Sequence, residues 1–361
     1  MTAITAARVV TPGAVIGPAV VEFDGGIIVS IATTSGPGDV ETLVPGFVDV
    51  QVNGIDYIDV ATASGNEWTQ LDQLLLQQGV TTWCPTLITA PLDSYAAVLA
   101  RIESSAARDG SRPTIAGVHL EGPFLTTPGA HSRDLLAAID LDWLARLPSL
   151  VRLVTLAPEL AGAIDATHLL AGRGVLVALG HTRATPDAVG AATTAGARMV
   201  THLFNAMSGL HHREPGVAGA ALADDRLACS LIADLVHVDA GALKIAFRAL
   251  GPERAVLVTD AVAWRGSSVG PLQVHMASGA PRLADGTLAG SALTMDQAIR
   301  NVVERCDVSL ADAVAAASTV PAHLLGLDDR GAIALCRRAD LVALDDAGFV
   351  GGVWLAGDRL R

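Results

Sequence analysis

Lysine is almost absent from this sequence of 361 residues, and basic residues as a whole are few. Lysine and arginine together number 24, against 37 aspartates and glutamates, and Lys244 is the one lysine. The formal net charge of -13 argues against a nucleic-acid-binding surface and against an anionic membrane face, because both partners require clustered cations. A phosphate subsite would therefore have to use arginine, histidine or backbone N–H groups.

Cysteines and long apolar runs are also scarce. The four cysteines are far apart and form no C-x-x-C pair, so neither a disulfide framework nor a thiolate zinc site is indicated. No stretch of 18 uncharged apolar residues occurs, and the first residues lack the basic and then apolar pattern of a signal peptide. We therefore expect a cytoplasmic protein with reduced cysteines and no membrane span.

Aromatic residues make up only 4% of the chain, although 51% of its residues are apolar. Ala, Val, Leu and Gly dominate, which is typical of Val- and Leu-rich parallel strands covered by Ala-rich helices. The length allows one large domain and a smaller one, since a single core stops growing at roughly 250–300 residues.

Short apolar runs alternate with helical patterns through the middle of the chain. Eight runs are visible, and eight parallel strands close a (β/α)8 barrel. The runs cover residues 47–53, 81–86, 115–121, 152–157, 175–181, 198–202, 227–233 and 255–260. Helices are expected at residues 68–78, 92–107, 134–146, 186–195, 240–250, 294–306 and 310–317. An open, doubly wound parallel sheet is the alternative fold.

Both ends of the chain show short strand patterns separated by glycine-rich turns. Two such segments can complete one small β-sandwich together, because each has an apolar face that needs a partner. We predict a small β-sandwich domain from residues 1–45 and 331–361, and a TIM-like (β/α)8 barrel domain from residues 46–330.

Ionisable side chains stand at the ends of four expected strands. In a barrel of this type the active site lies at the C-terminal ends of the strands, so these groups converge on one mouth. Taken singly, each histidine would be interpreted as a structural residue and the aspartate as a helix cap or salt-bridge partner; their joint occurrence favours a site. The residues, at the third, fifth, sixth and eighth strands, are Glu121, His181, His202 and Asp260.

Glu121, His181 and His202 form a three-ligand set for a divalent transition metal. Three protein ligands leave a position for water, as catalytic zinc sites require. Such a metal lowers the pKa of its water toward about 7, so that a nearby carboxylate can accept the proton at neutral pH. Asp260 is placed for that role.

Two amides, Gln51 and Asn53, end the first strand and lie on one face of it, because they are two residues apart. Histidines there would offer ligands to a second metal, but neutral amides are poor zinc ligands. We expect one divalent ion per subunit, with zinc the first choice and iron or manganese the alternatives. For Asn53 an ordinary Asn-Gly turn is an equally good interpretation.

Eight stretches occur together between about Pro45 and Asn301: "PGFVDVQVNG", "HLEGPFL", "GAH", "GHTRATP", "THLFNAMSGLHHREPG", "ADLVHVD", "VTDA" and "GTLAGSALTMDQAIRN". Together they closely resemble the N-acetylglucosamine-6-phosphate deacetylases of the amidohydrolase superfamily. The glutamate of "HLEGPF" is their most specific element. The resemblance implies hydrolysis of N-acetyl-D-glucosamine 6-phosphate to acetate and D-glucosamine 6-phosphate. It also implies the metal ligands named above and Asp260 as the base that then protonates the leaving amine.

The resemblance implies further roles outside the ligand set. His131 would polarise the acetyl carbonyl, or hold the developing oxyanion, opposite the metal. Arg213 would bind the phosphate from the neighbouring subunit of a homodimer. Without the resemblance, His131 would be interpreted as a loop histidine and Arg213 as a solvated arginine. The other implied substrate contacts are Ala130, Asn205, Ala206, His237, Leu288, Ala289 and Gly290.

Two alternative functions stay open at this point. One is a related amidohydrolase that acts on another N-acyl amino sugar or on a cyclic amide, and shares the metal and the base but not the phosphate subsite. The other is a non-catalytic sensor of sugar phosphates, although binding alone needs no proton shuttle such as Asp260.

Overall fold

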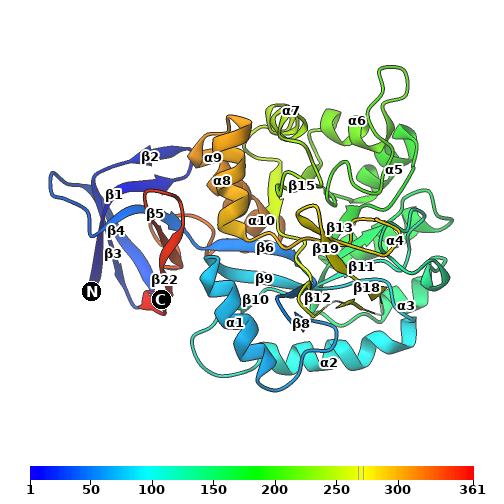
Figure 1. Ribbon diagram of the computed structural model, residues 1–361, viewed down its shortest axis with the longest axis horizontal. Helices are drawn as coiled ribbons and strands as arrows, with labels where there is room; N and C mark the ends of the chain where they lie inside the picture. The colour runs from blue at the N-terminus through cyan, green and yellow to red at the C-terminus, as the bar shows by residue number, and fades with distance from the viewer. Residues whose placement is uncertain (267, 271) are drawn as a thin grey trace.

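The computed structural model describes residues 1–266, 268–270 and 272–361, and two large sheets organise it. The larger sheet and its helices form one body, and a smaller sheet lies at its side (Figure 1). Each body has its own cluster of buried apolar side chains. The site described below belongs to the larger body.

The larger body is a ring of parallel strands in which sequence neighbours pair with one another. The last strand returns to the first, where Asp260 N donates to Gln51 O at 3.0 Å. The predicted (β/α)8 barrel is therefore confirmed, and the open doubly wound sheet is wrong. The eight strands are β6 (Phe47–Val52), β9 (Val80–Leu87), β11 (Val118–Glu121), β12 (Val151–Leu156), β13 (Leu176–Leu179), β14 (Met199–Val200), β15 (Ala228–Ile232) and β16 (Ala255–Val258).

The third expected strand is interrupted. A short strand, β10 (Thr114–Ile115), pairs with β9 before β11 does, and Gly117 lies between them outside any strand. Gly117 has a φ of +150°, and a Cβ there would lie 2.2 Å from Arg152 Cγ. Close packing against Arg152 therefore requires glycine at this point and breaks the strand.

Helices follow most strands and cover the outside of the ring (Figure 1). In α8 the buried apolar residues Met295, Ala298, Ile299 and Val302 recur at the spacing of one helix face. The remaining helices differ in length and in how much of their surface is buried. Besides α8 (Met295–Cys306), they are α1 (Glu67–Gln77), α2 (Tyr95–Ala106), α4 (Ala163–Gly172), α5 (Pro186–Ala195), α6 (Gly216–Ala223), α7 (Ala240–Leu250), α9 (Leu310–Ala317) and α10 (Thr319–Leu324), with a 3-10 turn η1 (Leu92–Ser94) before α2.

The single helix expected at residues 134–146 is wrong. The segment contains a 3-10 turn, η2 (Arg133–Leu135), then extended chain, then the five-residue helix α3 (Leu141–Ala145). Asp140 has extended backbone angles, and its carboxylate accepts from Trp143 N at 2.8 Å. This side-chain cap starts the helix at Leu141, because an N-cap residue lies outside the helix that it caps.

Both ends of the chain build the smaller sheet, as predicted, so that the first (blue) and last (red) strands lie together in Figure 1. The N-terminal strand β5 pairs with β21 from the C-terminal segment, with Leu43 opposite Ala343. The sheet contains β1 (Thr2–Thr11), β2 (Ala14–Ile16), β3 (Ala19–Asp24), β4 (Ile27–Thr33), β5 (Val40–Pro45), β21 (Leu341–Leu344), β22 (Val350–Leu355) and β23 (Asp358–Arg359).

Three short hairpins complete the secondary structure of the described residues. Two of them follow β16 and one follows β6, so all three leave strands at the carboxyl end of the barrel. They are β7 (Gly54–Ile55) with β8 (Ile58–Asp59), β17 (Ser268–Val269) with β18 (Leu272–Gln273), and β19 (His275–Ala277) with β20 (Ala280–Arg282). None of the helices in the described part of the chain has the length and apolar character that a membrane crossing needs.

Candidate active site

The four ionisable residues expected at strand ends lie where the barrel strands stop. Glu121 is the last residue of β11, and His181, His202 and Asp260 each follow their strand by two residues. The three that follow have positive φ angles of 50°, 33° and 48° in that order. Residues other than glycine rarely adopt a positive φ, and such backbone strain clusters at functional sites.

Tertiary hydrogen bonds hold these strained turns. His202 N donates to Ser230 Oγ at 2.7 Å, and Asp260 N donates to β6 as described above. The carbonyl of His181 accepts from Thr126 N at 3.1 Å and from Thr127 N at 2.8 Å. Each turn is therefore fixed by a neighbouring strand or loop and not by its own sequence.

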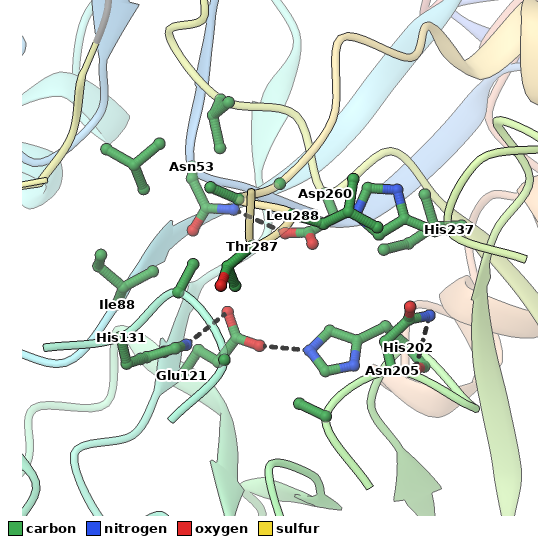
Figure 2. A pocket seen from close by; sticks show the side chains of 18 of the residues that line it. Asn53, Ile88, Glu121, His131, His202, Asn205, His237, Asp260, Thr287 and Leu288 are labelled. Carbon is green, nitrogen blue, oxygen red and sulfur yellow. Dashed lines mark hydrogen bonds and ion pairs between the residues drawn. The ribbon is translucent and has the colours of Figure 1, made fainter. Parts of the chain in front are cut away.

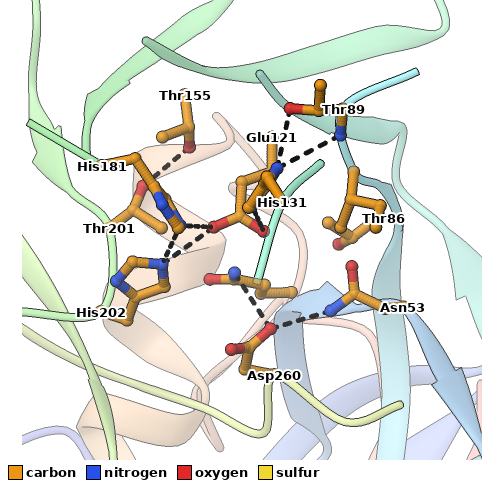
Figure 3. Close-up of polar contacts among 12 residues, drawn as sticks. Asn53, Thr86, Thr89, Glu121, His131, Thr155, His181, Thr201, His202 and Asp260 are labelled. Atoms are coloured by element: carbon orange, nitrogen blue, oxygen red, sulfur yellow. Dashed lines mark hydrogen bonds and ion pairs between the residues drawn. The ribbon is translucent and has the colours of Figure 1, made fainter. Parts of the chain in front are cut away.

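Glu121, His181 and His202, which we call the ligand cluster, lie in mutual contact (Figure 3). His202 Nε2 is 2.9 Å from Glu121 Oε1 and 3.1 Å from His181 Nε2, and His181 Nε2 is 3.2 Å from Glu121 Oε1. Bonds of about 2.0–2.1 Å to a tetrahedral zinc ion separate its ligands by about 3.3 Å. The spacing of the cluster is close to that of a ligand set.

The tautomer of His181 favours a cation in this cluster. His181 Nδ1 lies 2.8 Å from the carbonyl oxygen of Thr127, which can only accept, so Nδ1 carries the proton. In the neutral ring, His181 Nε2 then presents a lone pair to a carboxylate oxygen of Glu121. Two acceptors face each other, and a shared positive charge removes their repulsion. The donor set of one carboxylate and two imidazoles suits a divalent transition metal.

The pKa shifts of Glu121 and His202 also favour a positive charge in the cluster. Burial alone would raise the pKa of Glu121, but the contacts of its carboxylate with the imidazoles of His181 and His202 outweigh burial and hold this pKa well below its usual range. Burial would lower the pKa of His202, but the hydrogen bond to Glu121 outweighs it and raises this pKa. The cluster therefore stabilises an ionised carboxylate beside a positive charge.

His131 lies next to the cluster but has a different hydrogen-bonding pattern. Thr89 N donates to His131 Nδ1 at 3.3 Å, so this nitrogen is an acceptor and Nε2 carries the proton. Burial, helped by the charge of His181, lowers the pKa of His131 to about 3 and keeps it neutral.

A second metal-binding trio is conceivable on distance alone. The nearest ligand atoms of Glu121, His131 and His181 lie within 4.8 Å of one another. His131 Nε2 carries a proton and lies 3.8 Å from Glu121 Oε2, so this nitrogen has no lone pair to offer a metal. We therefore assign His131 as a hydrogen-bond donor and keep His202 in the ligand cluster.

Asp260 lies across the cavity from the ligand cluster (Figure 2). Its Oδ1 accepts from Asn53 Nδ2 at 2.8 Å and from Gln51 Nε2 at 3.1 Å. Burial, together with the charge of Glu121, raises the pKa of Asp260 to about 8. A carboxyl group with such a pKa can both accept and return a proton near neutral pH.

These groups line one cavity of about 240 Å³. Of the predicted site residues, twelve are in its wall, and only Arg213 is not. Arg213 lies in the exposed loop between β14 and α6. Lining residues that sequence reasoning missed include Ile88, Val262, Val269 and Thr287, which have no chemical signature. The twelve are Glu121, Ala130, His131, His181, His202, Asn205, Ala206, His237, Asp260, Leu288, Ala289 and Gly290.

A hydrogen-bonded pair also fixes His237 in the wall. His237 Nδ1 is 2.7 Å from Asp234 Oδ2, and the backbone N–H of His237 donates to Asp234 Oδ1 at 2.8 Å. The carboxylate holds the ring so that Nε2 is the nitrogen left for a ligand. Sequence reasoning named His237 but not Asp234.

Comparisons with known proteins agree with this geometry. The family model described as "Amidohydrolase family" matches residues 42–359. An N-acetylgalactosamine-6-phosphate deacetylase of Escherichia coli O157:H7 is 39% identical, over 88% of this chain and 88% of its own length. An N-acetylglucosamine-6-phosphate deacetylase of Bos taurus is also 39% identical, over 88% of this chain and 82% of its own.

Solved structures resemble the chain along its whole length. The N-acetylglucosamine-6-phosphate deacetylase of Thermotoga maritima has a TM-score of 0.94 at 30% identity, covering 100% of this chain and 99% of that one. A mutant of the Mycobacterium smegmatis enzyme, in complex with N-acetyl-D-glucosamine-6-phosphate, has a TM-score of 0.92 at 35% identity, covering 99% and 98%. The chain therefore belongs to the amidohydrolase family and, within it, to the N-acetylglucosamine-6-phosphate deacetylases.

Proposed function

We propose that this chain hydrolyses N-acetyl-D-glucosamine 6-phosphate to acetate and D-glucosamine 6-phosphate. The observation that carries the proposal is the cavity in which Asp260 faces the ligand cluster, with the Nε2–H of His131 beside them. The names of the relatives, and the sugar phosphate bound to the Mycobacterium smegmatis enzyme, support this substrate. A sensor without catalysis is disfavoured, because binding needs no base opposite a metal.

We assign one divalent ion per subunit to Glu121, His181 and His202, with zinc as the first choice and iron or manganese as alternatives. A bound ion would supply a Lewis acid that acidifies a water molecule and polarises the acetyl carbonyl. Gln51 and Asn53 donate their N–H groups to Asp260, and neutral amides are poor zinc ligands, which supports one ion and not two.

The protein side chains account for the proton transfers. The carboxylate of Asp260 accepts one proton from the attacking water as the water oxygen bonds to the acetyl carbon. It returns this proton to the nitrogen as the C–N bond breaks. The oxygen of the water thus ends in acetate, and one of its protons ends on the amine. His131 Nε2–H donates to the carbonyl oxygen while charge develops on it.

The sugar and its phosphate meet the rest of the cavity. We assign sugar or phosphate contacts to Asn205, Ala206 and His237, and the closing wall to the segment from Leu288 to Gly290, with Ala130 beside His131. No lysine or arginine occurs among the described residues that line the cavity. An arginine from elsewhere would add the cation that this lining lacks, and we propose a homodimer in which Arg213 of the partner subunit supplies it.

A substrate panel tests the proposal. Acetate release would be measured for N-acetylglucosamine 6-phosphate, its galacto epimer and unphosphorylated N-acetylglucosamine, before and after metal chelation. The galacto epimer is included because one 39% identical relative is named for it. We expect kcat/KM to be at least about 100-fold higher with the phosphate than without it, as loss of a charged contact predicts. Full activity after chelation, or no preference for phosphate, would contradict the proposal.

We also propose a cytoplasmic location and domain boundaries at residues 45/46 and 330/331. The four cysteines are all unpaired, as is usual in a reducing compartment. The strands of the smaller sheet all lie within residues 1–45 and 331–361, which supports the boundaries.

A further inference from the structure

Two side-chain amides at the end of β6 hold the carboxylate of Asp260 (Figure 3). Both amides are buried: Gln51 has no exposed surface, and 6% of Asn53 is exposed. Both donate to the same oxygen, Oδ1. Among the described residues, no hydrogen bond reaches Asp260 Oδ2. The amides therefore occupy one oxygen and leave the other for the cavity.

The orientation of the amides is set by Asp260. A carboxylate oxygen only accepts, so each amide must turn its NH2 group toward it. The carbonyl oxygens of Gln51 and Asn53 are then buried without a hydrogen-bond partner among the described residues. A buried acceptor without a partner is destabilising, so the charge-assisted bonds to Asp260 must outweigh this cost.

The backbone makes this arrangement rigid. Asp260 N donates to Gln51 O at 3.0 Å, and Asn53 N donates to Ala261 O at 2.8 Å. The two segments are thus joined on both sides of the side-chain contacts. The left-handed φ of Asp260, 48°, is fixed by this frame.

We propose that Gln51 and Asn53 are positioning residues for Asp260, whose Oδ1 they hold so that Oδ2 is presented to the reacting atoms. Two donors on one oxygen restrict rotation of the carboxylate, and they stabilise its ionised form before the proton arrives. The inference depends on the proposed deacetylation, in which Asp260 moves a proton from water to nitrogen.

Gln51→Met is the cleanest test, because Gln51 does not line the cavity and cannot touch the substrate. Methionine keeps the length of the side chain and removes both N–H donors. We expect kcat to fall about 10- to 100-fold, the cost of a misplaced catalytic group, with KM and metal content unchanged. Gln78→Met is the matched control, since Gln78 is also buried but accepts from Met295 N. Its kcat should stay at the wild-type value.

A double-mutant cycle shows whether the effect passes through Asp260. In the Asp260→Asn background, Gln51→Met should change the residual rate less than about two-fold, because the group that it positions is gone. Asn53→Ala provides a second variant if Gln51→Met does not fold. A crystal structure of either variant should show the Asp260 carboxylate in more than one orientation.

The inference is overturned if Gln51→Met and Asn53→Ala retain wild-type kcat. It is also overturned if Gln51→Met lowers kcat by the same factor in the wild-type enzyme and in the Asp260→Asn variant. An active site with an ordered, unrotated Asp260 in both variant structures would contradict it independently of turnover. Failure of the wild-type enzyme to release acetate would instead overturn the proposed function.

Discussion

The two walls of the cavity, one formed by the ligand cluster and the other by Asp260 with its amide donors, differ in their electrostatics. In the ligand cluster, a lone pair of His181 faces a carboxylate oxygen of Glu121, and the contact requires a positive charge. In the opposite wall, the carboxylate of Asp260 meets two N–H donors and needs no ion. The difference explains how one cavity can hold a cation on one side and a proton carrier on the other.

The walls also differ in how they are built. The ligand cluster brings together the ends of β11, β13 and β14, and its turns depend on loops. The wall around Asp260 joins β6 to β16, the first and last strands of the ring, through backbone hydrogen bonds. Asp260 is therefore positioned where the barrel closes.

The largest effect is expected from the ligand cluster. Glu121→Gln keeps the shape of the side chain but removes its charge, so the cluster should lose its ion. Bound metal should fall to a small fraction of one ion per chain, and kcat/KM should fall by about 10⁴-fold or more. Metal content and acetate release measure the two effects. Glu304→Gln, the same change at an exposed site in α8, is the control, and retained metal in Glu121→Gln would contradict the assignment.

Asp260→Asn separates the opposite wall from the ligand cluster. The amide cannot accept the proton of water, so kcat should fall about 10³-fold, within the usual range for a catalytic acid/base group. Metal content and KM should stay near the wild-type values, because Asp260 is outside the ligand cluster. Steady-state kinetics and metal analysis check the outcome. Loss of metal in this variant would place Asp260 among the metal ligands and would contradict the separation of the two walls.

Arg213 lies outside both walls and should affect binding more than chemistry. Arg213→Ala should lower kcat/KM for the phosphorylated sugar about 100-fold, mostly through KM, and leave the unphosphorylated sugar unaffected. Mixing Arg213→Ala with Asp260→Asn tests whether the arginine acts across a dimer. One site of each mixed dimer would hold an intact Asp260 and the partner subunit's intact arginine. Activity should therefore recover on mixing, and no recovery would contradict the shared site.

The smallest effect concerns Asp49, beneath the wall of Asp260. Its Oδ2 accepts from Thr259 Oγ1 at 2.5 Å, and burial raises its pKa from 3.8 to about 7 despite this bond. The folded state therefore binds a proton more tightly than the unfolded state between these pKa values, and the stability due to Asp49 is lost as pH rises from about 4 to about 7.

Asp49→Asn should remove this dependence. The free energy of unfolding of the wild type, relative to that of the variant, should be about 3 kcal/mol lower at pH 8 than at pH 4.5. Urea unfolding at the two pH values measures it. An equal difference between wild type and variant at both values would show that Asp49 does not titrate as described.

Much of the fold and the site follows from the sequence, because barrel geometry converts strand ends into neighbours. Glu121 and His202 are 81 positions apart, yet both end a strand of one ring. The tautomers of His131 and His181 could not be predicted in this way. They are set by backbone groups of Thr89 and Thr127, whose positions depend on tertiary packing.

The contacts of Gln51 and Asn53 illustrate the same limit. The sequence predicts that both side chains share a face at the end of the first strand. It does not show which group of each amide points to Asp260, because the ring closure between β6 and β16 decides that. The broken helix at residues 134–146 has a local cause, since the cap at Asp140 competes with an apolar pattern that favours a longer helix.

Metal stoichiometry tests the central claim most directly. The wild-type protein would be stripped by chelation, titrated with zinc, and assayed for bound metal and acetate release at each step. The contrast between the two walls predicts that activity rises in proportion to bound zinc and saturates at one ion per chain. Saturation at two ions per chain, or full activity of the stripped protein, would contradict it.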